Sequence, residues 1–452
     1  MENFQVSAFL TAIGIIAEMR IRPARRIRGQ VRVPGDKSIS HRAALIAALA
    51  NGTSTIANFS TGADCAATVA CLKALGVIIT EEGGNLIVKG VGRQGLKAST
   101  QQLDCGNSGS TMRLLAGVLA GQSFTSTLIG DKSLTARPMT RIIEPLQAMG
   151  ASVGSHEGKP PLTITGSGSL TAIAYDLPVS SAQVKTCVLL AALNAAGVTK
   201  VSESQGESRD HTERMLQWFG ATLSLQTNGG TQIVSLDGPG ILSARDITIP
   251  GDISSAAYLV AAATLIPNSD LLIEDIGLNP TRTAFLSLLE SFGLSFSLVS
   301  TREESNEPRG NIHVSGEHHS SRTGTSESGF SSAQMIDELP LLAVVGSQIQ
   351  GGIEIRDAGE LRFKESDRIA ATVANLRAMG ASVKEFDDGL QVELSRLHGT
   401  EIKSFGDHRI ALAFTVAALL AEGESEIADP ECVDISFPEF FDVLDSVVER
   451  WD

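Results

Sequence analysis

Basic side chains recur in short polar motifs that lead directly into apolar runs rich in small residues. They are Lys37, Arg42, Arg113, Arg137, Arg141, Lys185, Arg209, Arg282, Lys364, Arg368 and Arg409. If each apolar run is a helix, these side chains lie near first turns, where free N–H groups and the helix dipole attract anions. The chain as a whole carries a net charge of −15 at pH 7, which argues against a broad polyanion-binding surface. We therefore predict a cleft that binds small ligands carrying phosphate, or phosphate and carboxylate.

Three carboxylates stand beside these cations and could carry out general acid–base chemistry. Asp337 and Glu338 occupy the expected start of one helix, and Glu365 lies between Lys364 and Arg368. Flanking cations lower the pKa of a carboxyl group, whereas removal from water raises it, so the sign of any shift stays open. The alternative interpretation is that these carboxylates only complement the helix dipole.

Two pairs of basic residues have helical spacing. Arg137 and Arg141 are four residues apart, and so are Lys364 and Arg368. This spacing predicts that each pair shares one face of a helix. A solitary arginine at a helix start is usually a solvated surface charge, but so many cations at equivalent places favour a binding site.

Several other chemistries lack their sequence patterns. The GDKS motif at Gly35 lacks the glycine spacing of a phosphate-binding P-loop, and the chain has no GxSxG, HExxH or dinucleotide fingerprint opening a βαβ unit. The histidines have no metal-ligand spacing. Aromatic residues make up only 4% of the chain, which argues against a base-stacking platform. We therefore predict neither a metal site nor a nucleic-acid partner.

The cysteines and the first residues bear on localisation. The five cysteines are odd in number and widely spaced, with no CxxC, which predicts reduced thiols in a cytosolic protein. Residues 8–17 are apolar, but this run is too short to span a bilayer and follows no basic region. We interpret residues 1–18 as a peripheral extension and expect a soluble, cytoplasmic protein. The Ser-, Gly- and His-rich segment 315–332 is predicted to be a loop.

One pattern recurs six times: a polar motif, an apolar helix of small residues and a short strand. The copies begin at Gly35, Gly106, Ser180, Gly251, Met335 and Gly406. A second helix follows most copies and ends at a glycine that fits the C′ position, where a positive φ suits glycine. These glycines are Gly76, Gly150, Gly220, Gly293 and Gly380. Because the first helices are apolar nearly all round, we expect them to be buried behind sheets, in an α/β architecture of six repeats.

Two similar stretches mark the domain boundaries. Residues 31–40 and 247–256 each fit a strand, a Pro-Gly turn and a helix start. A chain of 452 residues is also long enough for two large domains. We therefore place residues 36–249 in one domain and residues 1–35 with 250–452 in the other, with the ligand cleft between them.

Taken in order, the motifs resemble those of the 5-enolpyruvylshikimate-3-phosphate synthase family over about residues 20–445. The matching motifs are GDKSISHR, GNSGSTMR, LTARPMTR, SAQVK, MIDELP, LRFKESDR, GDHRIA and SFPEF. The combination of GDK, SAQVK, RDHTE and NPTR is similar to the class II branch of that family. The resemblance implies a monomer with the enolpyruvyl transferase fold, an inside-out α/β barrel of two domains, each with three βαβαββ repeats.

The resemblance also implies a reaction in the shikimate pathway, which leads to chorismate and aromatic amino acids. The 5-hydroxyl of shikimate 3-phosphate attacks the enol carbon of phosphoenolpyruvate while the methylene carbon is protonated, and the tetrahedral adduct then eliminates phosphate. No metal or organic cofactor is implied, and glyphosate is an expected inhibitor.

Matching the family's motifs residue by residue implies the following roles. Shikimate 3-phosphate is bound by Lys37, Ser38, Arg42, Ser181, Ala182, Gln183, Arg209, Asp337 and Lys364. Phosphoenolpyruvate is bound by Lys37, Gly109, Arg137, Gln183, Arg368 and Arg409. The catalytic residues are Asp337, which accepts the proton of the 5-hydroxyl, Glu365, which is the acid and base at the methylene carbon, and Lys37, which touches both substrates. Lys364 bridges the two substrates.

Two departures from the family pattern and two alternative functions remain. Some glyphosate-tolerant class II members carry Ala where this chain has Gly109, so strong tolerance is not expected. Ile435 replaces a lysine of other branches, which removes one phosphate contact.

A UDP-N-acetylglucosamine enolpyruvyl transferase usually has a cysteine before its Arg-Pro, and residues 126–138 contain none. A non-catalytic anion-binding repeat protein would tolerate neutral substitutions at Asp337 and Glu365.

Overall fold

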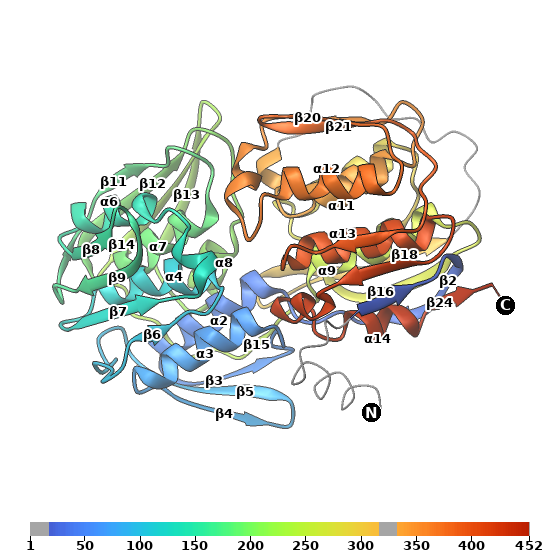
Figure 1. The fold of residues 1–452 in the computed structure, drawn as a ribbon. Coiled ribbons are helices and arrows are strands. Elements are labelled where there is room, and N and C mark those ends of the chain that lie inside the picture. The colour runs from blue at the N-terminus through green and yellow to red at the C-terminus, as the bar shows by residue number, and fades with distance from the viewer. Residues whose placement is uncertain (1–17, 316–331, 452) are drawn as a thin grey trace. The chain divides into compact units, whose positions relative to one another are not determined.

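The computed structural model of the protein describes residues 18–315 and 332–451 (Figure 1). The predicted extension and the predicted loop 315–332 lie outside these ranges, except that Glu18 begins a strand, Ser315 ends another and Ser332 begins a 3-10 helix. In the described part of the chain no helix is long and apolar enough to cross a membrane. The five cysteines are all buried, and none forms a disulfide.

The chain forms two compact units. Unit 1 contains the chain up to Val33, Gly251–Thr301 and the chain from Gly310, and unit 2 contains Pro34–Pro250 and Arg302–Arg309. This division differs from the predicted domains 1–35 with 250–452 and 36–249 by two residues or fewer at each boundary, and by the assignment of Arg302–Arg309 to unit 2. This segment is the tip of a hairpin, and its buried polar groups find their partners in unit 2. Glu307 lies 2.7 Å from His211 Nδ1, and Arg309 donates a 2.8 Å hydrogen bond to the carbonyl oxygen of Thr248.

Unit 2 alternates helices with short strands. Its helices are α2 (Lys37–Leu49), α3 (Ala63–Ala74), α4 (Gly109–Ala120), α5 (Lys132–Thr135), α6 (Thr140–Ala148), α7 (Ala182–Ala192) and α8 (His211–Trp218). Its strands are β3 (Asn51–Ala57), β4 (Ile78–Glu82), β5 (Asn85–Val91), β6 (Leu103–Asp104), β7 (Thr125–Ile129), β8 (Ser152–His156), β9 (Lys159–Thr165), β10 (Leu170–Thr171), β11 (Ala174–Asp176), β12 (Ala195–Glu203), β13 (Leu223–Asn228), β14 (Thr231–Gly238) and β15 (Ile247–Thr248).

Unit 1 has the same alternation. Its helices are α9 (Ile253–Leu265), α10 (Ala284–Ser291), α11 (Leu339–Gly346), α12 (Arg368–Ala378), α13 (His408–Leu420) and α14 (Phe440–Asp445), with 3-10 helices η1 (Ser332–Met335), η2 (Gly359–Phe363) and η3 (Pro430–Ile435). Its strands are β1 (Glu18–Ile21), β2 (Ala24–Val31), β16 (Asp270–Gly277), β17 (Ser297–Glu304), β18 (Glu307–Ser315), β19 (Ile353–Ile355), β20 (Val383–Phe386), β21 (Gly389–Val392), β22 (Glu401–Lys403), β23 (Ser425–Ala428) and β24 (Val448–Arg450).

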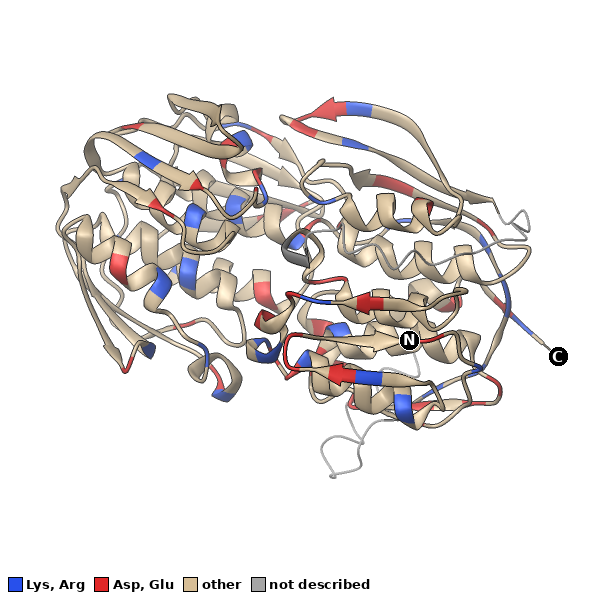
Figure 2. Cartoon of the chain, turned by 90° about the horizontal axis from the view of Figure 1, so that it is seen from above, with Lys and Arg blue, Asp and Glu red and all other residues tan. Residues whose placement is uncertain are grey.

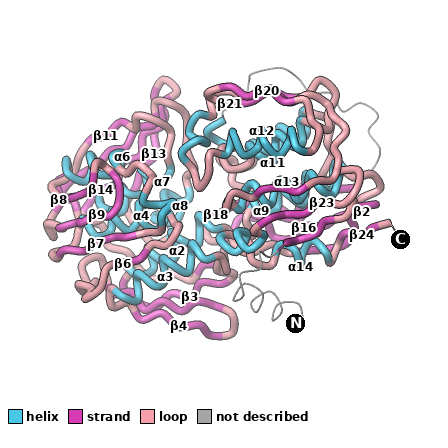
Figure 3. Tube along the Cα trace, viewed as in Figure 1, coloured by secondary structure: helices cyan, strands magenta, loops and turns pink. Residues whose placement is uncertain are grey.

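The described strands form three small sheets in each unit. The sheets of unit 2 run β15-β3-β5-β4, β6-β7-β9-β8 and β10-β12-β14-β13, and β11 also pairs with β12. Each joins a short parallel strand to an antiparallel set that ends in a hairpin, as in the parallel pair β15–β3, with Ile247 opposite Ile56, followed by β3–β5 and β4–β5. The sheets of unit 1 run β17-β18-β16-β2-β24, β19-β21-β20 and β1-β23-β22. Within each unit, Figure 3 shows helices lying behind these sheets.

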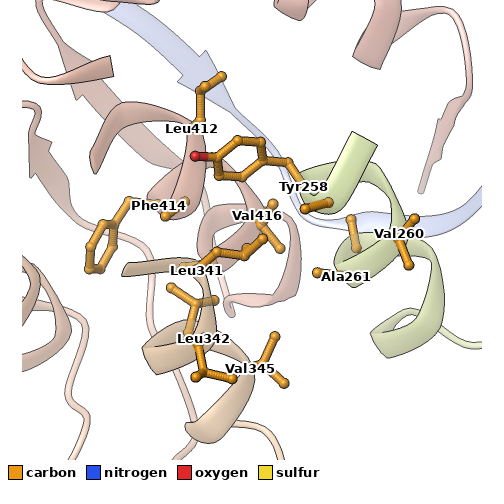
Figure 4. Close-up of a cluster of buried hydrophobic side chains, with 14 of the residues drawn as sticks. Tyr258, Val260, Ala261, Leu341, Leu342, Val345, Leu412, Phe414 and Val416 are labelled. Atoms are coloured by element: carbon orange, nitrogen blue, oxygen red, sulfur yellow. The ribbon is translucent and has the colours of Figure 1, made fainter. Parts of the chain in front are cut away.

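The first helix of each predicted repeat is buried on nearly every side, which confirms the prediction from its apolar residues. Every residue of α9 and of α11 is buried. Figure 4 shows the core of unit 1, where Tyr258 of α9, Leu342 of α11 and Phe414 of α13 lie in one cluster. Figure 2 shows helices with long stretches that carry no Lys, Arg, Asp or Glu. The charged side chains are therefore left to the helix ends, where the predicted site residues stand.

Polar caps and glycines fix where these helices begin and end. Asp36 caps α2 by accepting a 2.9 Å hydrogen bond from the Ile39 N–H. Side chains cap other helices in the same way, and they belong to Ser108, Ser181, Asp252, Asp367 and Asp407. Such caps satisfy N–H groups that have no partner within the helix. The five predicted C′ glycines all have positive φ, between 76° and 101°, which confirms their assignment.

Gly117 lets two buried helices of unit 2 approach each other, and its replacement by Ala is expected to destabilise the protein. A Cβ atom at Gly117 of α4 would lie 2.1 Å from the backbone carbonyl oxygen of Cys187 on α7, which cannot rotate away. Overpacking of this kind costs about 1–3 kcal/mol or more. Thermal unfolding followed by circular dichroism measures the loss. Gly359→Ala is the matched control, because its Cβ would have no neighbour within 4 Å. Equal melting temperatures for both variants would contradict the prediction.

Candidate active site

Lys37 is the first residue of α2 and is held by a carboxylate of the next helix. Its Nζ lies 3.1 Å from Asp64 Oδ2 on α3, and only 15% of its side chain is exposed. The ammonium group is therefore fixed at a helix N-terminus, where its charge adds to that of the helix dipole. Asp64 was not foreseen, because no spacing in the sequence connects it with Lys37.

Arg42 lies one turn further along α2 and is buried among oxygen acceptors. Its Nε donates to Thr212 Oγ1 at 2.7 Å, its Nη2 to Thr186 Oγ1 at 2.8 Å and its Nη1 to the Ser38 carbonyl at 2.8 Å. Arg209 joins the group from the segment before α8, where its Nη1 donates to Ser38 Oγ at 3.3 Å. The structure thus brings together two predicted phosphate ligands, Arg42 and Arg209, beside the predicted contact Ser38.

The first turn of α7 adds the next predicted residues. Ser181 caps the helix, and the carbonyl oxygen of Ala182 lies 3.5 Å from Arg42 Nη2. Gln183 Oε1 accepts a 2.7 Å hydrogen bond from Arg113 Nη1, and Gln183 Nε2 donates to the hydroxyl of Ser110 at 2.9 Å. The side chain of Gln183 is therefore held between α7 and the first turns of α4.

Gly109 begins α4 between two guanidinium groups. A Cβ atom built on Gly109 would lie 2.7 Å from Arg113 Nη1 and 3.3 Å from Arg137 Nη1. Arg137 is itself oriented by Asn107, whose Oδ1 accepts a 3.1 Å hydrogen bond. A helix N-terminus flanked by two arginines suits an anion. Because Gly109 has no side chain, both guanidinium groups can lie close to its backbone. Arg113 is one of the predicted cations, but its place in the sequence predicts no specific role for it.

Arg368 is the centre of a carboxylate cluster in unit 1. Its Nε lies 2.8 Å from Asp407 Oδ2, its Nη2 lies 2.6 Å from Glu365 Oε2 and its Nη1 lies 3.6 Å from Asp337 Oδ1. Only 2% of its side chain is exposed. Burial alone would lower the pKa of Arg368, but the three carboxylates outweigh it and the pKa is raised. The guanidinium therefore holds both predicted acid–base groups, Asp337 and Glu365, in one place.

Arg409 contacts the same cluster from the first turn of α13. Its guanidinium lies 4.0 Å from Asp337 Oδ2 and 3.9 Å from Glu338 Oε1. Glu338 also accepts a short hydrogen bond from the Ser254 hydroxyl, and that hydroxyl accepts a 2.7 Å hydrogen bond from Arg282. Glu338 thus orients Arg409 through this ion pair, a role that its position in the sequence does not reveal.

The two pairs of basic residues with four-residue spacing do not share helices, so that prediction is wrong. Lys364 follows η2 in an extended conformation, and Arg368 is the first residue of α12. Arg137 precedes α6, whereas Arg141 lies within it. The physical reason is that each motif contains a helix start between its two cations. Between Lys364 and Arg368 this helix start is fixed by Asp367, which caps α12.

The predicted site residues form one group in each unit. Unit 2 carries Lys37, Ser38, Arg42, Gly109, Arg137, Ser181, Ala182, Gln183 and Arg209, and unit 1 carries Asp337, Lys364, Glu365, Arg368 and Arg409. Within residues 18–315 and 332–451, no group of three or more His, Cys, Asp or Glu side chains is arranged to hold a metal ion. Cationic groups and carboxylates placed in this way are able to bind anions and to move protons.

Comparison with known families shows one match over almost the whole chain. The model of the EPSP synthase (3-phosphoshikimate 1-carboxyvinyltransferase) family matches residues 21–444. A relative from Koribacter versatilis named 3-phosphoshikimate 1-carboxyvinyltransferase is 52% identical over 434 residues, which cover 96% of this chain and 99% of the relative. A relative of the same name from Solibacter usitatus is 48% identical and covers 96% of this chain and 100% of its own length.

Solved structures give the same result for the fold. An EPSP synthase structure from Acinetobacter baumannii superposes with a TM-score of 0.83 at 39% identity, covering 95% of this chain and 98% of that one. A second structure of EPSP synthase from the same organism has a TM-score of 0.83 at 37% identity, covering 96% of this chain and 100% of the other. These matches confirm the predicted α/β fold class.

Proposed function

The chain belongs to the EPSP synthase family of 3-phosphoshikimate 1-carboxyvinyltransferases, and we propose that it uses the two groups of site residues described above for that reaction. It is a transferase of the shikimate pathway. It moves the enolpyruvyl group of phosphoenolpyruvate to the 5-hydroxyl of shikimate 3-phosphate and releases phosphate. The observation that supports the assignment of roles most directly is the cluster in which Arg368 holds both Asp337 and Glu365.

Shikimate 3-phosphate binds to the α2 side of unit 2 in this proposal. Arg42 and Arg209 carry the charge that a phosphate group requires, and both are oriented by Ser38. An arginine whose N–H groups are already aligned loses little conformational entropy when it binds a phosphate. Further contacts come from Lys37, Ser181, Ala182, Gln183, Asp337 and Lys364.

Phosphoenolpyruvate binds to the arginines of both units. Gly109 and Arg137 stand at the start of α4, and Arg368 and Arg409 stand at the starts of α12 and α13. The ligand carries a phosphate and a carboxylate, so several fixed cations are needed to offset its charge. Lys37 and Gln183 contact both substrates.

Catalysis proceeds by addition and elimination. Asp337 accepts the proton of the 5-hydroxyl as its oxygen bonds to the enol carbon, and Glu365 gives a proton to the methylene carbon. Glu365 then removes a proton from the resulting methyl group, the carbon–carbon double bond forms again, and phosphate leaves with the electrons of its carbon–oxygen bond. Arg368, 2.6 Å from Glu365 and 3.6 Å from Asp337, keeps both groups in position through both steps.

Lys364 bridges the two substrates as an ammonium ion, and this role predicts a pH dependence. Burial lowers the pKa of Lys364, and the nearby Arg368 adds to this effect, although Asp337 opposes it. The ammonium therefore loses its proton at a lower pH than an ordinary lysine, for which the pKa is about 10.4. We therefore expect kcat/KM to fall as the pH rises, and to do so before the pH reaches the pKa of an ordinary lysine. A pH profile of Lys364→Arg should lack this fall, because arginine stays charged; Lys384→Arg, at an exposed site, is the control. An unchanged profile in Lys364→Arg would contradict this role.

We further propose that the two units close around the ligands. One small ligand meets Arg137 of unit 2 and Arg409 of unit 1 only if both groups face a shared cleft. Small-angle scattering should show a smaller radius of gyration when shikimate 3-phosphate is added. A radius that does not change at saturating ligand would count against closure.

The reaction is tested by measuring phosphate release from the purified protein with both substrates present. Release should require both substrates, and UDP-N-acetylglucosamine in place of shikimate 3-phosphate should give none. Added glyphosate should compete with phosphoenolpyruvate. Release with the sugar nucleotide would favour the sister enzyme, and no release with either acceptor would favour a non-catalytic anion-binding protein.

We also propose that the two units are built from the repeats of the enolpyruvyl transferase fold. Six βαβαββ repeats, three in each unit, fit the three sheets of each unit and the six buried helices that begin the repeats. We also propose that the protein acts as a cytoplasmic monomer, which the family resemblance supports.

A further inference from the structure

Three charged side chains meet deep inside unit 2, and none of them is among the substrate contacts assigned above. Lys185 of α7 lies 2.8 Å from Glu203 Oε2 at the end of β12 and 2.6 Å from Glu213 Oε1 in the first turn of α8. At most 2% of each of these three side chains is exposed. Two carboxylates and one ammonium therefore share a site that water does not reach.

This triad also holds the backbone of the segment that joins β12 to α8. The Ser208 N–H donates a 3.1 Å hydrogen bond to Glu203 Oε1, and the Ser208 carbonyl lies 3.4 Å from Lys185 Nζ. The next residue is Arg209, whose guanidinium reaches Ser38. The segment is thus held through both peptide groups that flank the Cα atom of Ser208, directly before the predicted phosphate ligand.

A second link lies beside the triad and leads to the other phosphate ligand. Thr186, which follows Lys185, and Thr212, which precedes Glu213, have hydroxyl oxygens 2.5 Å apart. Both hydroxyls accept hydrogen bonds from Arg42. The distance between α7 and the start of α8 is therefore set by the ion pair and the hydroxyl pair together, and the orientation of Arg42 depends on that distance.

The cost of this arrangement argues for a role other than stability alone. Burial of charged groups costs several kcal/mol per ion, and packed apolar residues are often as stabilising as a buried ion pair. Burial raises the pKa of Glu213 even though Lys185 opposes this. For Lys185, burial would lower the pKa, but the two carboxylates together raise it. What an ionic triad adds over an apolar cluster is fixed directions and distances.

We propose that Lys185, Glu203 and Glu213 are positioning residues that set Arg209 and Arg42 for the phosphate of shikimate 3-phosphate. The inference rests on the proposed function. It assigns a physical role to the last residues of the SAQVK and RDHTE motifs, because those two residues form the Lys185–Glu213 ion pair. The triad should control the affinity for the phosphorylated acceptor and should affect phosphoenolpyruvate far less.

The test compares Glu213→Leu with Glu213→Gln. The leucine variant keeps the Lys185–Glu203 pair but removes the anchor of α8, whereas the glutamine variant keeps an oxygen acceptor for Lys185. For Glu213→Leu we expect KM for shikimate 3-phosphate to rise at least tenfold, with kcat and KM for phosphoenolpyruvate within about threefold of wild type. Glu213→Gln should recover most of the loss. Lys200→Met, which removes an exposed lysine of β12, is the matched control and should behave as wild type.

Hydrogen exchange separates this inference from the proposed function. Amides of residues 204–210 should exchange faster in Glu213→Leu than in wild type, and this measurement needs no turnover. If the wild-type protein releases no phosphate, the proposed function fails, and the substrate role of the triad fails with it, while faster exchange still shows that the triad holds the segment. If Glu213→Leu does not fold, Glu203→Leu provides the same test by removing the acceptor of the Ser208 N–H. A folded variant with KM for shikimate 3-phosphate within twofold of wild type, or with equal increases in KM for both substrates, would overturn the proposal.

Discussion

Replacing Glu365 by Gln, or Asp337 by Ala, is expected to lower kcat by roughly 100- to 10,000-fold, which is the usual contribution of a positioned acid or base. The amide of the Glu365→Gln variant could not deliver a proton to the methylene carbon, and the methyl group of the Asp337→Ala variant could not take one from the 5-hydroxyl. The cations that bind the substrates remain in both variants. We therefore expect dissociation constants measured by calorimetry to stay within about tenfold of wild type while turnover collapses.

The control for these variants is Glu393→Gln, which neutralises an exposed carboxylate of unit 1. Its kcat should equal that of wild type. Activity within a few-fold of wild type in Glu365→Gln or Asp337→Ala would remove that residue from the mechanism. It would also favour the alternative in which these carboxylates only complement helix dipoles.

Replacing Arg368 by Leu is expected to cause the largest loss of stability of any single change in the site. The variant would leave Asp407, Glu365 and Asp337 without the guanidinium that they share, and the Asp407 side chain is fully buried. Removal of one partner from a buried ion pair costs about 3–5 kcal/mol. In a unit of this size that corresponds to a fall in Tm of roughly 10 °C. Binding of phosphoenolpyruvate should be lost as well.

Two variants bracket that prediction. Arg368→Lys keeps one positive charge and should recover part of the stability, but it cannot contact Asp407 and Glu365 in the same bidentate way. Arg356→Leu breaks exposed ion pairs with Glu354 and Asp388 and should change Tm very little. If Arg368→Leu melts at the temperature of Arg356→Leu, the cluster does not hold the site together.

The features that could be predicted from the sequence are those that depend on residues close to one another in the chain. The glycines that end the second helices are an example, because each depends on residues within one turn of its helix. The burial of helices such as α9 follows from composition alone. The family's motifs then supplied the roles of the site residues, which composition and spacing could not give.

The features that could not be predicted are pairings between distant segments. Asp64 holds Lys37 across 27 residues, Thr212 holds Arg42 across 170, and Asp407 holds Arg368 across 39. A threonine or an aspartate has many possible partners, and its own position does not select one of them. The same limit applies to Arg302–Arg309, because the residues of a charged hairpin tip do not show in which unit their partners lie.

The sheets of unit 1 join strands that lie near opposite ends of the sequence. Strand β2 pairs with β24, with Ile27 opposite Val448, and β1 pairs with β23. Among the described strands, β1 and the β24 edge of β2 therefore pair with segments near the other end of the sequence, whereas the other edge of β2 pairs with β16, with Arg28 opposite Asp270. All of Pro34–Pro250 lies between these paired segments in the sequence, so the sheets of unit 1 can be completed only after the long segment of unit 2 has been translated.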